Sequence, residues 1–256
     1  GEYLARFADQ NEEIVIDVIK VIQTENWRVQ ETLVDALMKI QPASAADLSD
    51  VIDPWLNGLF SHGLSDKLIP LIEYLTHQRY GDAAIKILES LITPVLKSPT
   101  GEYSKYFSPV RFRTDHYWIN EYCSKSLPEL INLEPVGVVS ALKRQLIAVL
   151  ELVRQTNPDD IELQTGYYWR IDIPKRRSEH GEAEVLDVLV DGLIDGLAEV
   201  CRQFVEVGEG ILSKCLISEH LILQRIALHT LRSYGHNYPS LLYQVFLRRD
   251  YLETAV

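Results

Sequence analysis

Apolar residues recur at helical spacing along most of this chain, and this periodicity limits its fold more than any other feature. Segment 134–155 carries five such residues on one helical face: Leu142, Leu146, Val149, Leu150 and Val153. Segment 182–208 carries a second stripe, made of Leu186, Leu189, Leu193 and Leu197. About five further helices of roughly 10–15 residues are predicted within the first hundred residues, joined by short turns. The pattern predicts an all-α protein.

Polar residues mark several of the predicted helix starts. Asn26 is predicted to cap a helix that begins at Trp27. Ser44, with Asp47 three residues later, resembles a capping box for the helix predicted within 41–60. Ser65 is predicted to cap the next helix.

Short apolar helices are marginal alone and must pack against neighbours, which favours a helical bundle or an α-solenoid. The stretch "LILQRIALHTL" (221–231) resembles the second helix of a HEAT-type repeat, and 80–92 and 26–40 are weaker echoes of it. In this stretch a basic residue is followed by a small residue and two leucines: Arg225, Ala227, Leu228 and Leu231.

The resemblance implies units of about 40 residues with two helices each. We therefore expect an irregular HEAT-like α-solenoid of about twelve helices, with two aromatic and basic loop insertions. The last helices also resemble the helical C-terminal arrays of very large bacterial NTP-binding proteins, some of them in phage defence. That likeness implies a regulatory segment whose catalytic motifs lie outside this chain.

The predicted organisation has three parts. Helical repeats occupy 1–97, an aromatic-rich insertion with short helices occupies 98–133, and further repeats occupy 134–256 with a loop insertion at 156–181. Because the chain starts at Gly1 in a helical pattern, we expect one continuous domain cut from a longer protein.

Composition narrows the functional classes. The net charge of −12 disfavours a surface devoted to nucleic acid, which needs a basic face. No apolar run approaches the ~20 residues that span a bilayer, so no membrane segment is predicted. The three cysteines, Cys123, Cys201 and Cys215, form no CxxC pair and are interpreted as buried reduced thiols, which fits the cytoplasm.

Sequence motifs for catalysis are missing from the chain, which has no phosphate-loop, dinucleotide-binding, HExxH or GxSxG pattern. Asp187, Asp191 and Asp195 are aligned at a spacing of four, but such rows also occur on solvated helix faces. His220 and His229 would lie on opposite faces of one helix, and Asp115 beside His116 has no nucleophile near it in sequence. No catalytic residue, metal site or cofactor is predicted.

Two irregular segments, 97–113 and 156–181, are longer than ordinary helix connections. Both are rich in aromatic residues, and within them the stretches 99–113 and 164–180 each carry a net charge of +2 on an acidic chain. The stretch 169–173 could also form a short strand that pairs with 110–113. The predicted partner-binding residues are Tyr168, Trp169, Arg170, Lys175, Arg176, Arg177, Arg111 and Arg113.

Three interpretations of the second insertion stay open. Its aromatic side chains cover the core between helices, or they anchor a protein partner beside the arginines, since Trp, Tyr and Arg dominate binding hot spots. In the third, the basic residues hold phosphates while aromatic rings stack on bases. We predict a non-enzymatic scaffold or recognition module that binds proteins or other domains of the same protein. The alternatives are the regulatory segment of a bacterial NTPase and a nucleic-acid-binding helical repeat.

Overall fold

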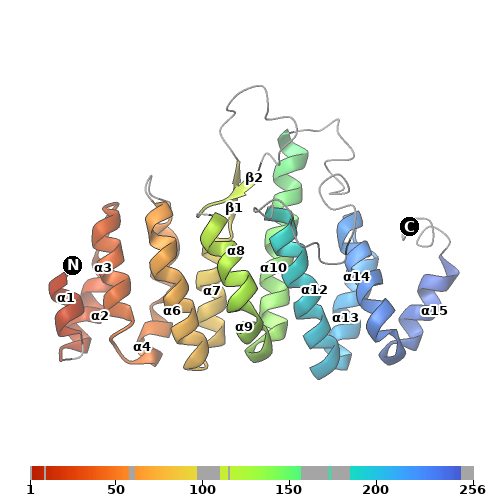
Figure 1. The fold of residues 1–256 in the computed structure, drawn as a ribbon, viewed down its shortest axis with the longest axis horizontal. Coiled ribbons are helices and arrows are strands. Elements are labelled where there is room, and N and C mark those ends of the chain that lie inside the picture. Colours follow the sequence, from red (N-terminus) through yellow and green to blue (C-terminus); the bar gives the residue numbers. More distant parts are fainter. Residues whose placement is uncertain are drawn as a thin grey trace. The chain divides into compact units, whose positions relative to one another are not determined.

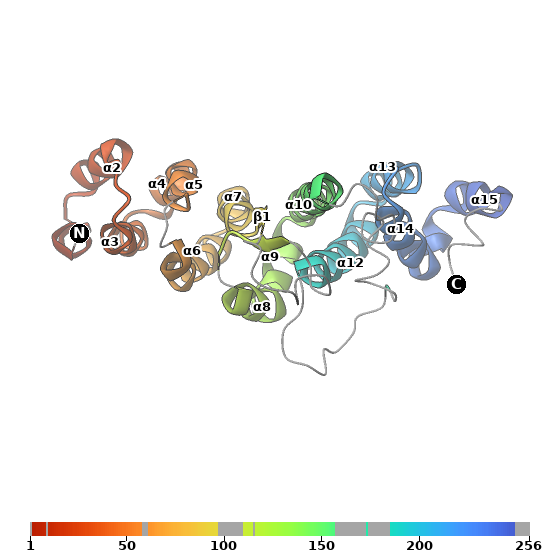
Figure 2. The same cartoon turned by 90° about the horizontal axis from the view of Figure 1, so that it is seen from above.

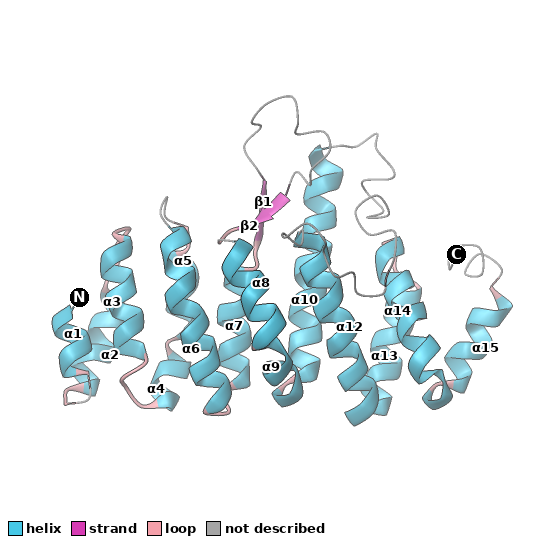
Figure 3. Ribbon diagram, viewed as in Figure 1, coloured by secondary structure: helices cyan, strands magenta, loops and turns pink. Residues whose placement is uncertain are grey.

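The computed structural model describes residues 2–8, 10–57, 61–96, 110–114, 116–156, 173 and 185–248. Fourteen α-helices and one two-stranded sheet make up this part of the chain (Figure 3). The predicted all-α class is confirmed. The helix count exceeds the predicted one because several segments expected to be continuous are broken.

The chain divides into two compact units. The first comprises Gly1–Val95 and Phe112–Gly137, and the second comprises Leu96–Arg111 and Val138–Val256. The division predicted at 97 and 133 rests on where the helical periodicity is interrupted, and it stays a prediction.

The first unit is organised around α6, which contacts α3, α7, α8 and α9. Figure 2 shows its helices in two rows, with α2, α4, α5 and α7 in one and α1, α3, α6 and α8 in the other. The bounds of its helices are α1 Glu2–Phe7, α2 Glu12–Val21, α3 Trp27–Leu37, α4 Pro42–Asp47, η1 Ser49–Val51, α5 Ile52–Trp55, η2 Ser61–Leu64, α6 Ser65–His77, α7 Gly81–Leu91, α8 His116–Lys125 and α9 Leu127–Leu133 (Figure 1).

The second unit contains a group of three mutually packed helices, α12, α13 and α14. Its helices also form two rows, one with α10, α13 and α15 and one with α12 and α14 (Figure 2). Their bounds are α10 Pro135–Thr156, α12 Val185–Gln203, α13 Val205–Leu216, α14 Leu221–Tyr234, η4 Gly235–Asn237 and α15 Pro239–Leu247.

The predicted apolar stripes form the core of the second unit. All five predicted inward residues of α10 are buried, and so are the four leucines of α12. Gly196 allows α12 to approach α10 closely, because a Cβ there would lie 2.7 Å from Cγ2 of Val139. Helical periodicity therefore identified the buried faces correctly.

Prolines mark where several helices begin. Pro42, Pro128 and Pro239 lie in the first two positions of α4, α9 and α15. A proline is favourable there because its missing N–H would have no partner within the helix, and its φ is already helical. Pro70 is an exception, since it lies inside α6.

Two predicted caps are wrong. α4 begins at Pro42, so Ser44 lies inside the helix instead of capping it. The η2 turn runs directly into α6, and Ser65 is therefore the first residue of that helix. The Ser65 hydroxyl is buried and has no hydrogen-bond partner among the described residues. The helix predicted within 41–60 is also divided, into α4, η1 and α5.

The predicted helix over 182–208 is two helices. α12 ends at Gln203, and Phe204 breaks the helix with φ −134° and ψ 67° before α13 begins. This break lets α13 turn back and pack against α12. Phe204 itself is 43% exposed, although helical spacing extends the buried stripe to it. The packing of α13 against α12 therefore decides where the helix ends, and the apolar periodicity does not.

The predicted strand at 110–113 is present, and its predicted pairing with 169–173 stays a prediction, because most of that segment lies outside the described residues. β2 (Val110–Phe112) pairs with β1 (Pro94–Leu96) in the two-stranded sheet of the described residues. Residues 169–172 lie outside the described part of the chain, and Ile173 is buried.

A polar turn opens α3 and confirms the predicted cap. The Asn26 side chain accepts a hydrogen bond of 3.1 Å from the Arg28 N–H, and the Asn26 N–H donates to Thr24 Oγ1 at 3.1 Å. Gln30, only 2% exposed, donates from Nε2 to the Thr24 carbonyl at 2.7 Å. Both hydrogen bonds at Thr24 fix the chain just before the helix.

The same turn opens α14 in the second unit. The His220 N–H donates to Ser218 Oγ at 3.2 Å, and Gln224 Nε2 donates to the Ser218 carbonyl at 2.7 Å. The sequences "TENWRVQ" (24–30) and "SEHLILQ" (218–224) share this spacing of hydroxyl, acid and glutamine. One residue differs in its use: His220 holds the N-cap position, but its side chain does not cap the helix.

Among the described residues, no helix combines the length and the apolar character needed to cross a membrane.

We expect two glycines of α13 to respond in opposite ways to alanine. A Cβ on Gly208 would collide with the Tyr238 hydroxyl, whereas a Cβ on Gly210 meets nothing within 4 Å. Gly208→Ala should destabilise the protein by about 1–3 kcal/mol through overpacking. Gly210→Ala should stabilise it by up to about 1 kcal/mol, because alanine favours the helix. Urea unfolding checks both, and a stable Gly208→Ala protein would contradict the close contact.

Candidate functional site

Two of the eight predicted partner-binding residues, Arg111 and Arg113, lie in the described part of the chain. They follow the first insertion, where the chain returns through β2. The other six predicted residues, Tyr168, Trp169, Arg170, Lys175, Arg176 and Arg177, lie outside the described residues.

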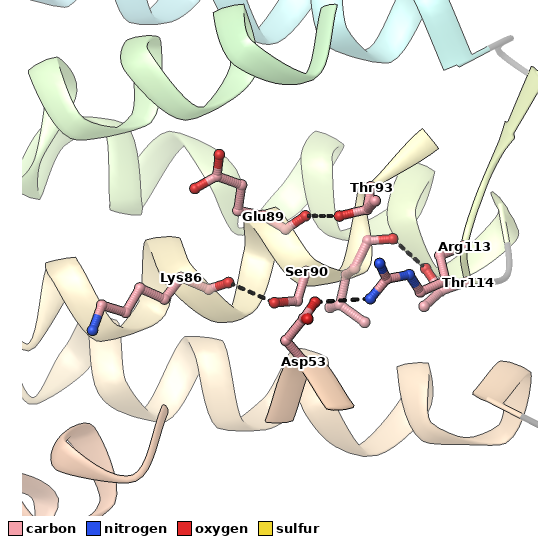
Figure 4. A network of polar contacts seen from close by, with 8 residues as sticks. Asp53, Lys86, Glu89, Ser90, Thr93, Arg113 and Thr114 are labelled. Carbon is pink, nitrogen blue, oxygen red and sulfur yellow. Dashed lines mark hydrogen bonds and ion pairs between the residues drawn. The ribbon is translucent and has the colours of Figure 1, made fainter. Parts of the chain in front are cut away.

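Arg113 fastens the end of the first insertion to the helices of the first unit. Its guanidinium Nη1 donates to Oδ1 of Asp53, at the start of α5, over 2.8 Å. Its backbone N–H donates to the Thr93 carbonyl at 2.8 Å. Figure 4 shows this guanidinium directed at Asp53 beside the end of α7. The Arg113 side chain is only 18% exposed, and Asp53 is its carboxylate partner within the chain.

Two threonines complete this attachment (Figure 4). Thr114, 3% exposed, donates from Oγ1 to the Leu91 carbonyl at 2.9 Å and so satisfies a backbone acceptor at the end of α7. Thr93 donates from Oγ1 to the Glu89 carbonyl at 2.9 Å. We call Asp53, Thr93, Arg113 and Thr114 the root network.

Arg111 lies between two buried residues of β2. Val110 and Phe112 are fully buried, whereas Arg111 is half-buried. Successive side chains of a strand point to opposite faces, so Arg111 lies on the face away from those apolar groups. It makes contacts of its own within the chain. Its role in binding a partner stays a prediction.

Sequence reasoning did not find Asp53, which the root network requires. Asp53 and Arg113 are 60 residues apart in the chain. An exposed aspartate inside a short helix carries no local signal for such a pairing. The signal for Arg113 was its basic character, which is equally compatible with solvent, a partner or an internal carboxylate.

One group in the described residues has the composition of a metal site: Glu151, Glu219 and His220. Neither His229 nor His236 belongs to it. Asp187, Asp191 and Asp195 are half-buried on α12 and make contacts within the chain.

The three cysteines are free thiols; Cys201 and Cys215 are buried as interpreted from the sequence, whereas Cys123 is half-buried. Burial raises the pKa of Cys123 to about 12, and it also raises the pKa values of Cys201 and Cys215. The neighbouring Tyr122 is buried too, which holds its pKa well above the ordinary value, and its hydroxyl has no partner among the described residues. Thiols in this state are protonated at neutral pH and are poor nucleophiles.

A hollow of about 500 Å³ lies between α1 and α3 in the first unit. Asp35 on its wall is paired with Lys67 at 3.0 Å, and Thr32 donates to the Val29 carbonyl at 2.7 Å. Asp35 and Thr32 are thus already engaged in the fold. Its lining consists of Ala5, Arg6, Thr32, Asp35, Met38 and Lys39.

No protein-family model matches this chain, and the searches of curated proteins and of solved structures also gave no match.

The ion pair of the root network should be energetically coupled. A double-mutant cycle on Arg113→Ala and Asp53→Ala should give about 0.5–1 kcal/mol, because Arg113 is largely shielded from solvent. Lys86 and Asp50, at 3.0 Å, are 54% and 74% exposed and form the matched control, with coupling near zero. A coupling energy near zero in the Arg113–Asp53 cycle would contradict the predicted contribution of the root network.

Cys123 should contribute to a loss of stability at alkaline pH. Its folded pKa is about 12, raised from 9.0, so the unfolded chain releases this proton first as the pH rises. The contribution is complete below about pH 9 and is lost between about pH 9 and 12, at about 1.4 kcal/mol per pH unit. Urea unfolding under reducing conditions should show a shallower alkaline slope for Cys123→Ala. Parallel curves for both proteins throughout this range would contradict the burial of the thiol.

Proposed function

We propose that this chain is a non-enzymatic, HEAT-like helical-repeat module that binds a protein partner through its two aromatic and basic insertions. In the second unit consecutive helices alternate between two rows, and in the first unit α1 to α8 do so except that α4 and α5 share a row; paired repeat helices would produce such an arrangement (Figure 2). The shared turn at Thr24 and Ser218 also supports a repeated building block. Helices stacked in this way would provide stability between neighbours and leave loops to provide specificity.

The root network is the observation that carries the proposal. The chain leaves the helical frame through β1 and returns through β2, and the returning end is fixed by Arg113 and Thr114. The intervening segment 97–109 contains Tyr103, Tyr106 and Phe107. Loops that a rigid scaffold positions are the usual carriers of binding residues. In this proposal Arg113 positions the loop, and Arg111 with the second insertion contacts the partner.

Charge favours a protein partner over nucleic acid. The stretches 99–113 and 164–180 of the insertions each carry +2, but the chain as a whole carries −12, so phosphate backbones would be repelled over most of the surface. An acidic protein surface with apolar pockets would suit Trp169 and Arg176, which are hot-spot residue types. The free thiols are compatible with our placement of the protein in the reducing cytoplasm.

A pull-down from lysate of the source cells tests the proposal with the variant Trp169→Ala, Arg176→Glu. We expect a protein that wild type retains and the variant releases, with unchanged helical circular dichroism. The matched control is Tyr243→Ala, Lys214→Glu, which makes the same kinds of change at exposed residues of α15 and α13. This control should keep the partner.

The opposite pattern would contradict the proposal. If the control loses the partner and the insertion variant keeps it, binding lies on the helical surface. If the insertion variant unfolds, its aromatic residues cover the core. Retention of nucleic acid that declines steeply with salt would favour the nucleic-acid-binding alternative. Co-purification with an NTPase would favour the regulatory alternative.

A further inference from the structure

Three potential metal ligands converge in the second unit. Glu151 lies near the end of α10, and Glu219 and His220 form the turn between α13 and α14. One ligand atom from each residue lies within 4.8 Å of the other two. These residues come from two segments almost 70 residues apart, so the fold alone brings them together.

His220 occupies its position in an unusual way. Asn26 holds the equivalent position in the turn before α3, and its side chain caps that helix. The His220 imidazole does not cap α14 but is directed toward Glu151, with 14% of its side chain exposed. Its Nε2 lies 4.0 Å from Oε1 of Glu151. That separation exceeds a hydrogen bond, and no side-chain hydrogen bond joins this imidazole to another described residue.

We propose that Glu151, Glu219 and His220 bind a divalent transition-metal ion, with Zn²⁺ as the best match. Zinc binds imidazole nitrogen and carboxylate oxygen at about 2.0–2.2 Å, so ligand atoms around a tetrahedral ion lie about 3.3–3.6 Å from one another. The observed separations require side-chain movements of less than about one ångström to meet at one ion. The imidazole disfavours Ca²⁺ and Mg²⁺, which select oxygen ligands.

Electrostatics supports occupancy by a cation. Two carboxylates close together repel each other. A divalent ion compensates both charges and uses the imidazole as a third ligand. Glu219 is exposed and Glu151 is 41% exposed, so an ion can enter from solvent. Water would complete the coordination.

The bound ion would fasten the end of α10 to the start of α14. Both helices belong to the second unit. The side chain of His220 does not cap α14, so the ion would hold the start of this helix through His220 instead. Because such an ion binds the folded chain preferentially, it raises the unfolding temperature of the protein as its concentration rises. This role is structural and does not depend on the proposed partner binding.

Isothermal titration calorimetry of the whole chain with Zn²⁺, in a buffer free of chelators, tests this site. We expect one ion per chain and affinity reduced at least tenfold by each of His220→Asn, Glu151→Gln and Glu219→Gln. His220→Asn is informative because asparagine caps α3 at the equivalent position, so α14 should keep its helix. Circular dichroism verifies the fold, and exposed Glu219 provides a variant with little structural risk.

His236→Asn is the matched control, since this exposed histidine of the second unit lies outside the cluster. It should leave affinity and stoichiometry unchanged. The proposal is overturned if wild type binds no Zn²⁺, or if the three cluster variants bind as tightly as the control. Equal binding of Ca²⁺ by wild type and His220→Asn, without selective Zn²⁺ binding, would show a nonspecific acidic surface and also overturn it. Thermal unfolding should show a zinc-dependent increase for wild type and His236→Asn only.

Discussion

Burial of apolar helix faces is the constraint on which the rest of this structure depends. Most helices of the first unit are too short to be stable alone, and α6 is stabilised by packing against four neighbours. In the second unit the leucine stripe of α12 is buried along its whole length. Close approach at Gly196 and Gly208 requires the absence of a side chain at these two positions. Apolar packing determines the positions of the helices, and the polar contacts described above stabilise the turns and loops between them.

Polar contacts are concentrated where this frame changes direction. The turns before α3 and α14 are held by the same pair of hydrogen bonds, from a backbone N–H and from a glutamine amide. The root network does the equivalent work where β2 joins the first unit. Such contacts add modest free energy individually, but they satisfy backbone groups that would otherwise be buried without partners. They therefore determine where loops begin and which way they leave.

The two proposed roles use different parts of the molecule. Partner recognition relies on the insertions and on a root network in which Arg113 is already engaged. Metal binding relies on a position where the second copy of a turn departs from the first, with His220 in place of the capping Asn26. The comparison of the two turns shows this difference, because Asn26 caps α3 whereas His220, at the equivalent position, does not cap α14.

The sequence by itself determined the all-α class, the buried faces of α10 and α12, the cap at Asn26 and a strand at 110–112. Each of these depends on residues within a few positions of one another, so local periodicity and capping chemistry suffice. Only the tertiary structure decided that the helix over 182–208 breaks at Phe204, that β2 pairs with β1, and that Arg113 meets Asp53. It also brought Glu151 to His220. These outcomes depend on contacts between distant segments, whose free energies exceed local preferences and leave no pattern in either segment alone.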